Sequence, residues 1–78
     1  MEFDYSYLRG FIVEQFGTNK EFARFLGISE NTLSLRLHNK IDFTTAEIKK
    51  LINEFDLSGD DVKNFFFKEK KIRKRKSI

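Results

Sequence analysis

Apolar residues recur every three or four positions along most of the chain, a spacing that predicts amphipathic helices. The first such stripe consists of Leu8, Phe11, Ile12 and Phe16. Asp4 or Ser6 is expected to cap this helix at its start, and Gly17 is expected to end it. Proline is absent and the four glycines are spread out, so we expect short connections between helices.

Two Thr-x-x-Glu sequences predict the starts of a second and a fourth helix, because each residue of such a pair can accept a backbone N–H of the other. They are Thr18–Glu21 and Thr44–Glu47, and Gly27 is expected to stop the second helix. The apolar residues that follow them are Phe22, Ala23 and Leu26 in the second helix and Ile48, Leu51, Ile52 and Phe55 in the fourth.

Serines are the natural N-caps of a third and a fifth helix. Ser29 precedes the third helix, which carries Leu33 and Leu37 on one face, and Asn39 can take the left-handed conformation that ends it. Ser58 precedes the fifth, which begins near Gly59 and whose apolar residues are Val62, Phe65 and Phe66. Ile41 and Phe43 are expected to pin the loop 40–43 to the core. The pattern therefore predicts an all-α fold of five helices.

Length and composition limit the class of protein. A chain of 78 residues with no cysteine and one histidine is expected to form one small domain without a disulfide, a metal or a cofactor. These residues leave too little to assemble an active site, so we do not expect an enzyme. No apolar run approaches the length of a membrane span and the N-terminus lacks a signal peptide, which predicts a soluble, cytoplasmic protein.

The formal net charge of +3 is unevenly distributed. Residues 1–67 hold eight Lys and Arg against eleven Asp and Glu, a balance of −3, whereas residues 68–78 hold seven against one, a balance of +6. We therefore predict a domain over residues 1–67 and a basic C-terminal tail over 68–78, largely disordered when alone. Because the basic character comes from the tail, net charge alone gives no argument for DNA binding.

The segment Lys20–Lys40, KEFARFLGISENTLSLRLHNK, predicts two short helices that meet at a glycine turn. It resembles the helix-turn-helix of the lambda-repressor-like group, particularly the small Cro and CI-type regulators of phages and prophages. The residues that carry the resemblance are Ala23, Gly27, Ile28, Ser29, Leu33, Leu37, Asn39 and Lys40. The resemblance implies a five-helix lambda-repressor-like DNA-binding domain, with the helix-turn-helix at the second and third helices, in a transcriptional regulator. Two residues depart from the group. At the position of Leu35 the group usually has a small or polar residue, and at the position of Arg36 it usually has an apolar residue.

A third helix in the major groove would present its first turns to the base edges. Asn31 can pair with adenine, Glu30 can accept from cytosine, and Leu35 can rest on a thymine methyl. The predicted base-contacting residues are Glu30, Asn31, Thr32, Ser34 and Leu35. A solvated helix surface is the alternative for Glu30 and Asn31, and burial in the core or in a protein interface is the alternative for Leu35.

Phosphate contacts are expected on both sides of that helix, because backbone N–H groups at a helix start and nearby cations attract phosphate. Within the domain they are Thr18, Asn19, Lys20, Arg36, His38, Asn39 and Lys40, and in the tail they are Lys70, Lys71, Arg73, Lys74, Arg75 and Lys76. The tail could instead be only a solubilising end.

Three consecutive phenylalanines, Phe65, Phe66 and Phe67, sweep about 200° around a helix, which is wider than one core-facing stripe. At least one of them should be exposed, and we predict a dimer or partner contact there, with local collapse as the alternative.

The main hypothesis is a sequence-specific, Cro-like phage repressor that occupies a double-stranded DNA operator. We expect it to be a homodimer, at least when it is bound to DNA. The alternative is a protein-binding modulator or antirepressor that acts on the cognate repressor, which the acidic balance of residues 1–67 favours. An antitoxin is a third option.

Overall fold

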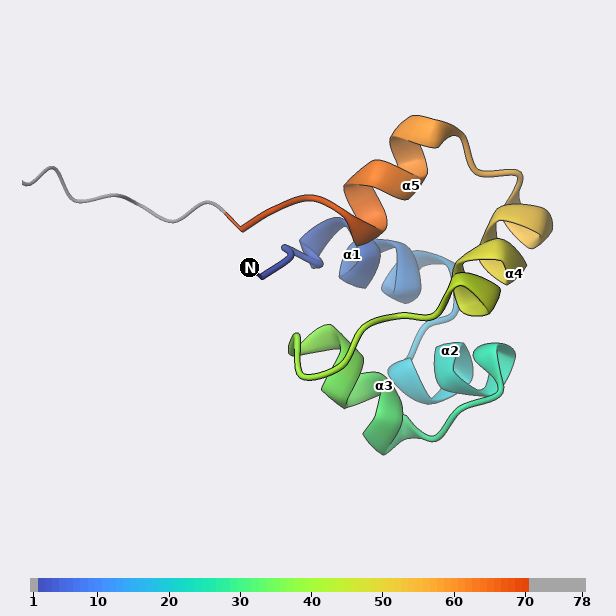
Figure 1. Ribbon diagram of the computed structural model, residues 1–78. Helices are drawn as coiled ribbons and strands as arrows, with labels where there is room; N and C mark the ends of the chain where they lie inside the picture. Colours follow the sequence, from blue (N-terminus) through green and yellow to red (C-terminus); the bar gives the residue numbers. More distant parts are fainter. Residues whose placement is uncertain (1, 71–78) are drawn as a thin grey trace, which may run out of the picture.

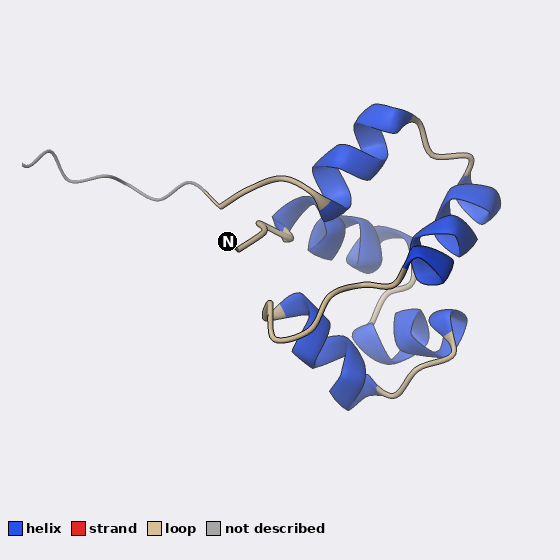
Figure 2. Ribbon diagram, viewed as in Figure 1, coloured by secondary structure: helices blue, strands red, loops and turns tan. Residues whose placement is uncertain are grey.

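The computed structural model describes residues 2–70, and within that range the chain forms five α-helices and no strand (Figures 1 and 2). The helices are α1 (Ser6–Gln15), α2 (Asn19–Leu26), α3 (Glu30–Leu37), α4 (Thr45–Phe55) and α5 (Gly59–Phe66). The prediction of an all-α chain with five helices is confirmed. No helix in this range is long and apolar enough to cross a membrane.

Hydroxyl caps begin four of the five helices. The side chains of Thr18, Ser29, Thr44 and Ser58 each accept the backbone N–H three residues later. The Glu47 carboxylate in turn accepts the backbone N–H of Thr44, as the Thr-x-x-Glu pattern predicts. Glu21 makes no such bond to Thr18, and its carboxylate instead lies 3.6 Å from the Arg24 guanidinium. Each cap satisfies a donor that the helix leaves unpaired, a contribution of about 1 kcal/mol.

The start of α1 differs from the prediction. Its N-cap is Tyr5, which makes no side-chain cap bond, so neither Asp4 nor Ser6 holds that position. The Asp4 carboxylate does accept the backbone N–H of Ser6 at 2.9 Å. This bond lowers the pKa of Asp4, because it stabilises the charged form.

Left-handed residues end three of the helices where the sequence predicts them, and the first is Gly17, which lies just beyond α1 with φ +84°. Gly27 follows α2 with φ +80°. Asn39 lies beyond α3 with φ +61°, and a side chain that is short and polar tolerates this region better than most. The two short helices therefore meet at the glycine turn, as predicted.

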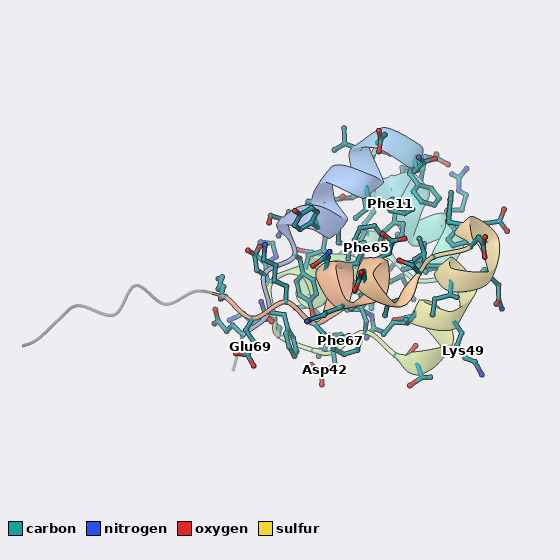
Figure 3. The ribbon with its side chains drawn as sticks, turned by 90° about the horizontal axis from the view of Figure 1, so that it is seen from above. Phe11, Asp42, Lys49, Phe65, Phe67 and Glu69 are labelled. Atoms are coloured by element: carbon teal, nitrogen blue, oxygen red, sulfur yellow. The ribbon has the colours of Figure 1, made fainter. Side chains whose placement is uncertain are left out.

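The core lies between two helical layers (Figure 1). α1 packs against α5 in one layer, α2 packs against α3 in the other, and α4 closes one side. The largest fully buried side chains are Leu8, Ile12, Phe22, Leu33 and Leu51. Ala23 is also buried, which allows α2 and α3 to approach closely. The rings of Phe11 and Phe65 lie 4.9 Å apart between α1 and α5 (Figure 3).

The loop before α4 is pinned by one of its two predicted anchors. Phe43 packs edge-on against Tyr5 and Phe66, with ring centroids 5.4 and 5.2 Å apart. Ile41 is 41% exposed, which corrects the expectation that it anchors the loop. Its backbone N–H bonds to the carbonyl of Leu35, so the chain turns tightly after α3 and leaves this side chain outside.

Candidate functional site

The outer face of α3 is open to solvent. Glu30, Asn31, Ser34 and His38 are exposed, and Leu35 is 38% exposed. Thr32 is half-buried, and its hydroxyl lies 3.0 Å from that of the Ser29 cap. Glu30 and Asn31 are thus available to a partner, and Leu35 is left outside the core.

Other predicted contact residues lie at the edges of this face. Thr18, Asn19, Lys20 and Lys40 are exposed. The His38 side chain folds back onto the last turn of α3, because its Nδ1 donates to the carbonyl of Ser34 at 2.8 Å. The base-contact and phosphate-contact roles of these residues stay predictions.

Arg36 is different. It is only 9% exposed, and its guanidinium lies 3.1 Å from the Glu47 carboxylate of α4, which is 8% exposed. Arg36 also donates to the backbone carbonyl of Asp42. This corrects the expectation that Arg36 contacts phosphate at the surface. Its long side chain lies inward because α4 supplies a buried carboxylate, a neighbour that the local sequence of α3 does not reveal.

Asn39 is also committed within the fold. Its amide accepts from the backbone N–H of Phe3 at 2.9 Å and donates to the carbonyl of the same residue at 3.0 Å. With both ends of the amide paired, we remove Asn39 from the phosphate-contacting residues. The asparagine instead ties the end of α3 to the N-terminal segment.

The N-terminal segment is held from the other side by residues 68–70. Asp4 donates its backbone N–H to the carbonyl of Lys68, and Lys70 donates its own to the carbonyl of Glu2. The Lys70 ammonium lies 3.0 Å from the Glu2 carboxylate, and this contact lowers the pKa of Glu2. We call these residues and Asn39 the terminal clasp.

The terminal clasp includes residues of the predicted tail. The described chain is hydrogen-bonded as far as Lys70, three residues into the predicted tail, and the side chain of Lys70 is paired with Glu2. The other predicted tail contacts lie outside the described residues. They are Lys71, Arg73, Lys74, Arg75 and Lys76.

The three consecutive phenylalanines have three different environments. Phe66 is buried at 2% exposure, Phe65 is half-buried, and Phe67 is 51% exposed. The expectation that at least one ring is exposed is confirmed for Phe67. Whether it forms a dimer or partner contact stays a prediction.

Phe67 borders a pocket of about 310 Å³ that the sequence does not reveal. Its lining residues are Phe3, Tyr5, Asp42, Phe43, Thr45, Ile48, Phe66 and Phe67. They come from three separate stretches of the chain, and only the exposed phenylalanine gave a signal in the sequence. Burial raises the pKa of the Tyr5 hydroxyl, and the nearby charge of Asp42 raises it further. We call this the aromatic pocket.

A family model described as "Protein of unknown function (DUF739)" matches residues 1–69. The chain belongs to the DUF739 family. No curated protein matches this DUF739 member. Among solved structures, it is similar to the modulator of repression (MOR) of the temperate bacteriophage TP901-1 from Lactococcus lactis, determined in solution. The two are 40% identical with a TM-score of 0.68, over 86% of this chain and 90% of the phage protein.

The similarity to MOR extends over most of this DUF739 chain and over most of the phage protein. It supports the part of the sequence-based expectation that concerns a phage regulatory protein. The phage protein is a modulator of repression, which fits the alternative hypothesis better than the main one.

Proposed function

We propose that this protein is a non-enzymatic modulator of phage repression that acts by binding a repressor protein. The observation that carries the proposal is the similarity to MOR, at 40% identity and a TM-score of 0.68 along nearly the whole chain. The expected Cro-like repressor is accordingly the second candidate.

The charges of the domain also support a protein partner. Residues 1–67 carry a balance of −3, and the guanidinium of Arg36 is paired inside the molecule rather than presented by α3. Apart from the basic residues 68–78, this surface therefore repels a polyanion and attracts a basic protein. A repressor must present cations to DNA phosphates, so its basic surface complements this domain.

Exposed apolar side chains give the second physical support. Leu35 on α3 and Phe67 after α5 are 38% and 51% exposed, which costs free energy in water. Ile41, bonded through its backbone to the carbonyl of Leu35, adds a third exposed apolar side chain beside α3. Apolar residues with a polar rim are typical of protein interfaces.

Titration calorimetry with a purified repressor encoded beside the gene tests the proposal. We expect a saturable complex, and we expect Leu35→Ser to weaken it about tenfold, since an interface would bury this side chain. Val13→Ser is the matched control, because Val13 is even more exposed but lies on α1. If the wild-type protein does not bind the repressor, the proposed function is wrong. If Leu35→Ser and Val13→Ser both bind as well as wild type, the function stands and Leu35 lies outside the interface.

Direct DNA binding is the second candidate function, because the α2–turn–α3 unit has the order of a helix-turn-helix and leaves Glu30 and Asn31 exposed. Selection of bound duplexes from a random pool tests it. A DNA reader should enrich one sequence, and Asn31→Ala should relax the preference at one base position. An enriched sequence without repressor binding would favour this function over modulation. Homodimer formation on DNA and an antitoxin role stay predictions.

A further inference from the structure

The aromatic pocket combines ring faces with a carboxylate. Five of its lining residues are aromatic, and Asp42 is the one acidic residue among them. Figure 3 shows Asp42 and Phe67 at the same edge of the molecule. Within residues 2–70, no side chain forms an ion pair with Asp42, so its charge is available to a ligand.

Two lysines that follow α5 are engaged by groups other than this carboxylate. Lys68 places its ammonium over the ring of Tyr7, 4.7 Å from the centroid. Lys70 is paired with Glu2 in the terminal clasp. Both cations are therefore held by other partners, and the pocket keeps the negative charge of Asp42 beside the negative faces of its rings.

The pocket is already braced by contacts within the protein. The rings of Phe3 and Phe67 meet edge-on with centroids 6.0 Å apart, and Phe43 is held between Tyr5 and Phe66. Arg36 donates to the carbonyl of Asp42 and so fixes the backbone that carries the carboxylate. A ligand would find these groups largely in place, which lowers the entropy that binding must overcome.

We propose that the aromatic pocket binds an arginine side chain of a protein partner. The guanidinium pairs with the Asp42 carboxylate and lies against the Phe67 ring, while the methylene stem contacts the other aromatic walls. A planar, weakly hydrated cation suits a site that offers both ring faces and a carboxylate. In assigning this arginine to the repressor, we rely on the function proposed above, whereas the chemistry of the pocket stands without it.

The chemistry is tested by NMR titration of the ¹⁵N-labelled protein with N-acetyl-arginine amide. We expect saturable shifts in the millimolar range that cluster at Tyr5, Asp42, Phe43 and Phe67. N-acetyl-citrulline amide is the matched probe, since it has the same shape without the charge. Equal responses to the two probes, a stronger response to N-acetyl-lysine amide, or shifts spread over the surface would overturn the proposal.

Two variants locate the binding. Asp42→Asn keeps the backbone carbonyl that Arg36 uses and removes the charge, so the fold should persist while the arginine response falls about tenfold. Phe67→Ala should reduce it severalfold, with circular dichroism to check the fold. Glu54→Gln is the control, because it removes an exposed carboxylate of α4 that does not line the pocket. If Asp42→Asn and Glu54→Gln respond alike, the site is elsewhere.

The repressor gives an independent measurement. Asp42→Asn should weaken repressor binding about tenfold while Glu54→Gln leaves it unchanged. If the repressor binds wild type and Asp42→Asn equally, the proposed function stands and the pocket assignment falls. If the repressor does not bind at all but the arginine probe does, the proposed function falls and the pocket chemistry stands.

Discussion

Two ion pairs tie distant parts of this chain together, and they differ in their surroundings. Arg36 and Glu47 join α3 to α4 across 3.1 Å, with both side chains about nine-tenths buried. Lys70 and Glu2 join the two ends of the described chain across 3.0 Å, with both side chains more than half exposed. The distances are nearly the same, so any difference in what the pairs contribute comes from the access of water.

The comparison shows that each pair is suited to a different task. An exposed pair gains little, because water solvates both charges when they separate. A buried charge has no such alternative, and removal of its partner leaves it desolvated and unpaired. Arg36 therefore fixes the relation of α3, the Asp42 loop and α4, whereas the terminal clasp can open at small cost. The Nε atom of Arg36 is buried with no partner in the described chain, so even the inner pair is not fully compensated.

The largest effect is expected from breaking the buried pair on one side. Arg36→Ala should lower the free energy of unfolding by about 3 to 5 kcal/mol, because Glu47 then keeps a charge in an apolar environment. This is comparable with the whole stability of a small domain, so urea unfolding should show a protein that is largely unfolded at room temperature.

A double variant makes that comparison sharper. Arg36→Met with Glu47→Gln removes both charges, and the glutamine carbonyl can still accept the Thr44 N–H that Glu47 accepts now. We expect this variant to recover most of the stability lost in Arg36→Ala. If the double variant is as unstable as the single one, the loss comes from packing rather than from an uncompensated charge.

An intermediate effect is expected in the clasp at Asn39, which combines two hydrogen bonds with a left-handed backbone. Asn39→Ala should cost about 2 to 3 kcal/mol, since it loses the bonds to Phe3 and strains the backbone. Asn39→Gly loses the bonds but tolerates the backbone conformation, so it should cost less. Thermal unfolding of the two variants separates the contributions. Equal losses would show that the backbone conformation contributes nothing.

The smallest effect is expected from acid acting on the exposed pair. The pKa of Glu2 is lowered from 4.5 by Lys70, and that of Asp4 is lowered from 3.8 by the Ser6 N–H. A lowered pKa in the folded state means that the stabilisation is present above the ordinary value and is lost as the pH falls through the lowered one. Amide shifts of Phe3 and Lys70 should therefore stay constant down to about pH 4.5 and change below it.

Glu2→Gln is the control for this titration. The variant should leave the midpoint of thermal unfolding unchanged at neutral pH, because both side chains of the pair are exposed. It should also remove most of the pH dependence at Lys70, while the backbone bond from Lys70 to the Glu2 carbonyl remains. A large stability loss in this variant would show that the clasp is as important as the buried pair.

Contacts between distant residues, such as these two ion pairs, also mark the limit of what the sequence predicts about this fold. Local patterns predicted all five helices, the hydroxyl caps, the glycine turn after α2 and the left-handed Asn39, because each depends on neighbours within a few residues. They did not predict the environments of Arg36 and Asn39. On α3 alone, an arginine near the end of a polar helix looks solvent-exposed, and only the approach of Glu47 from α4 makes its burial favourable.

The aromatic pocket is the clearest case of information that appears only when the chain folds. The run of three phenylalanines showed that one ring would be exposed, since one core cannot cover 200° of a helix. That Phe67 meets Phe3, and that Asp42 lies at the same pocket, depends on contacts between the two ends of the chain and the loop before α4. Hydrophobic periodicity and capping act within one helical turn and are written in adjacent residues. The surfaces that recognise a partner are assembled across long sequence separations, so tertiary packing alone decided them.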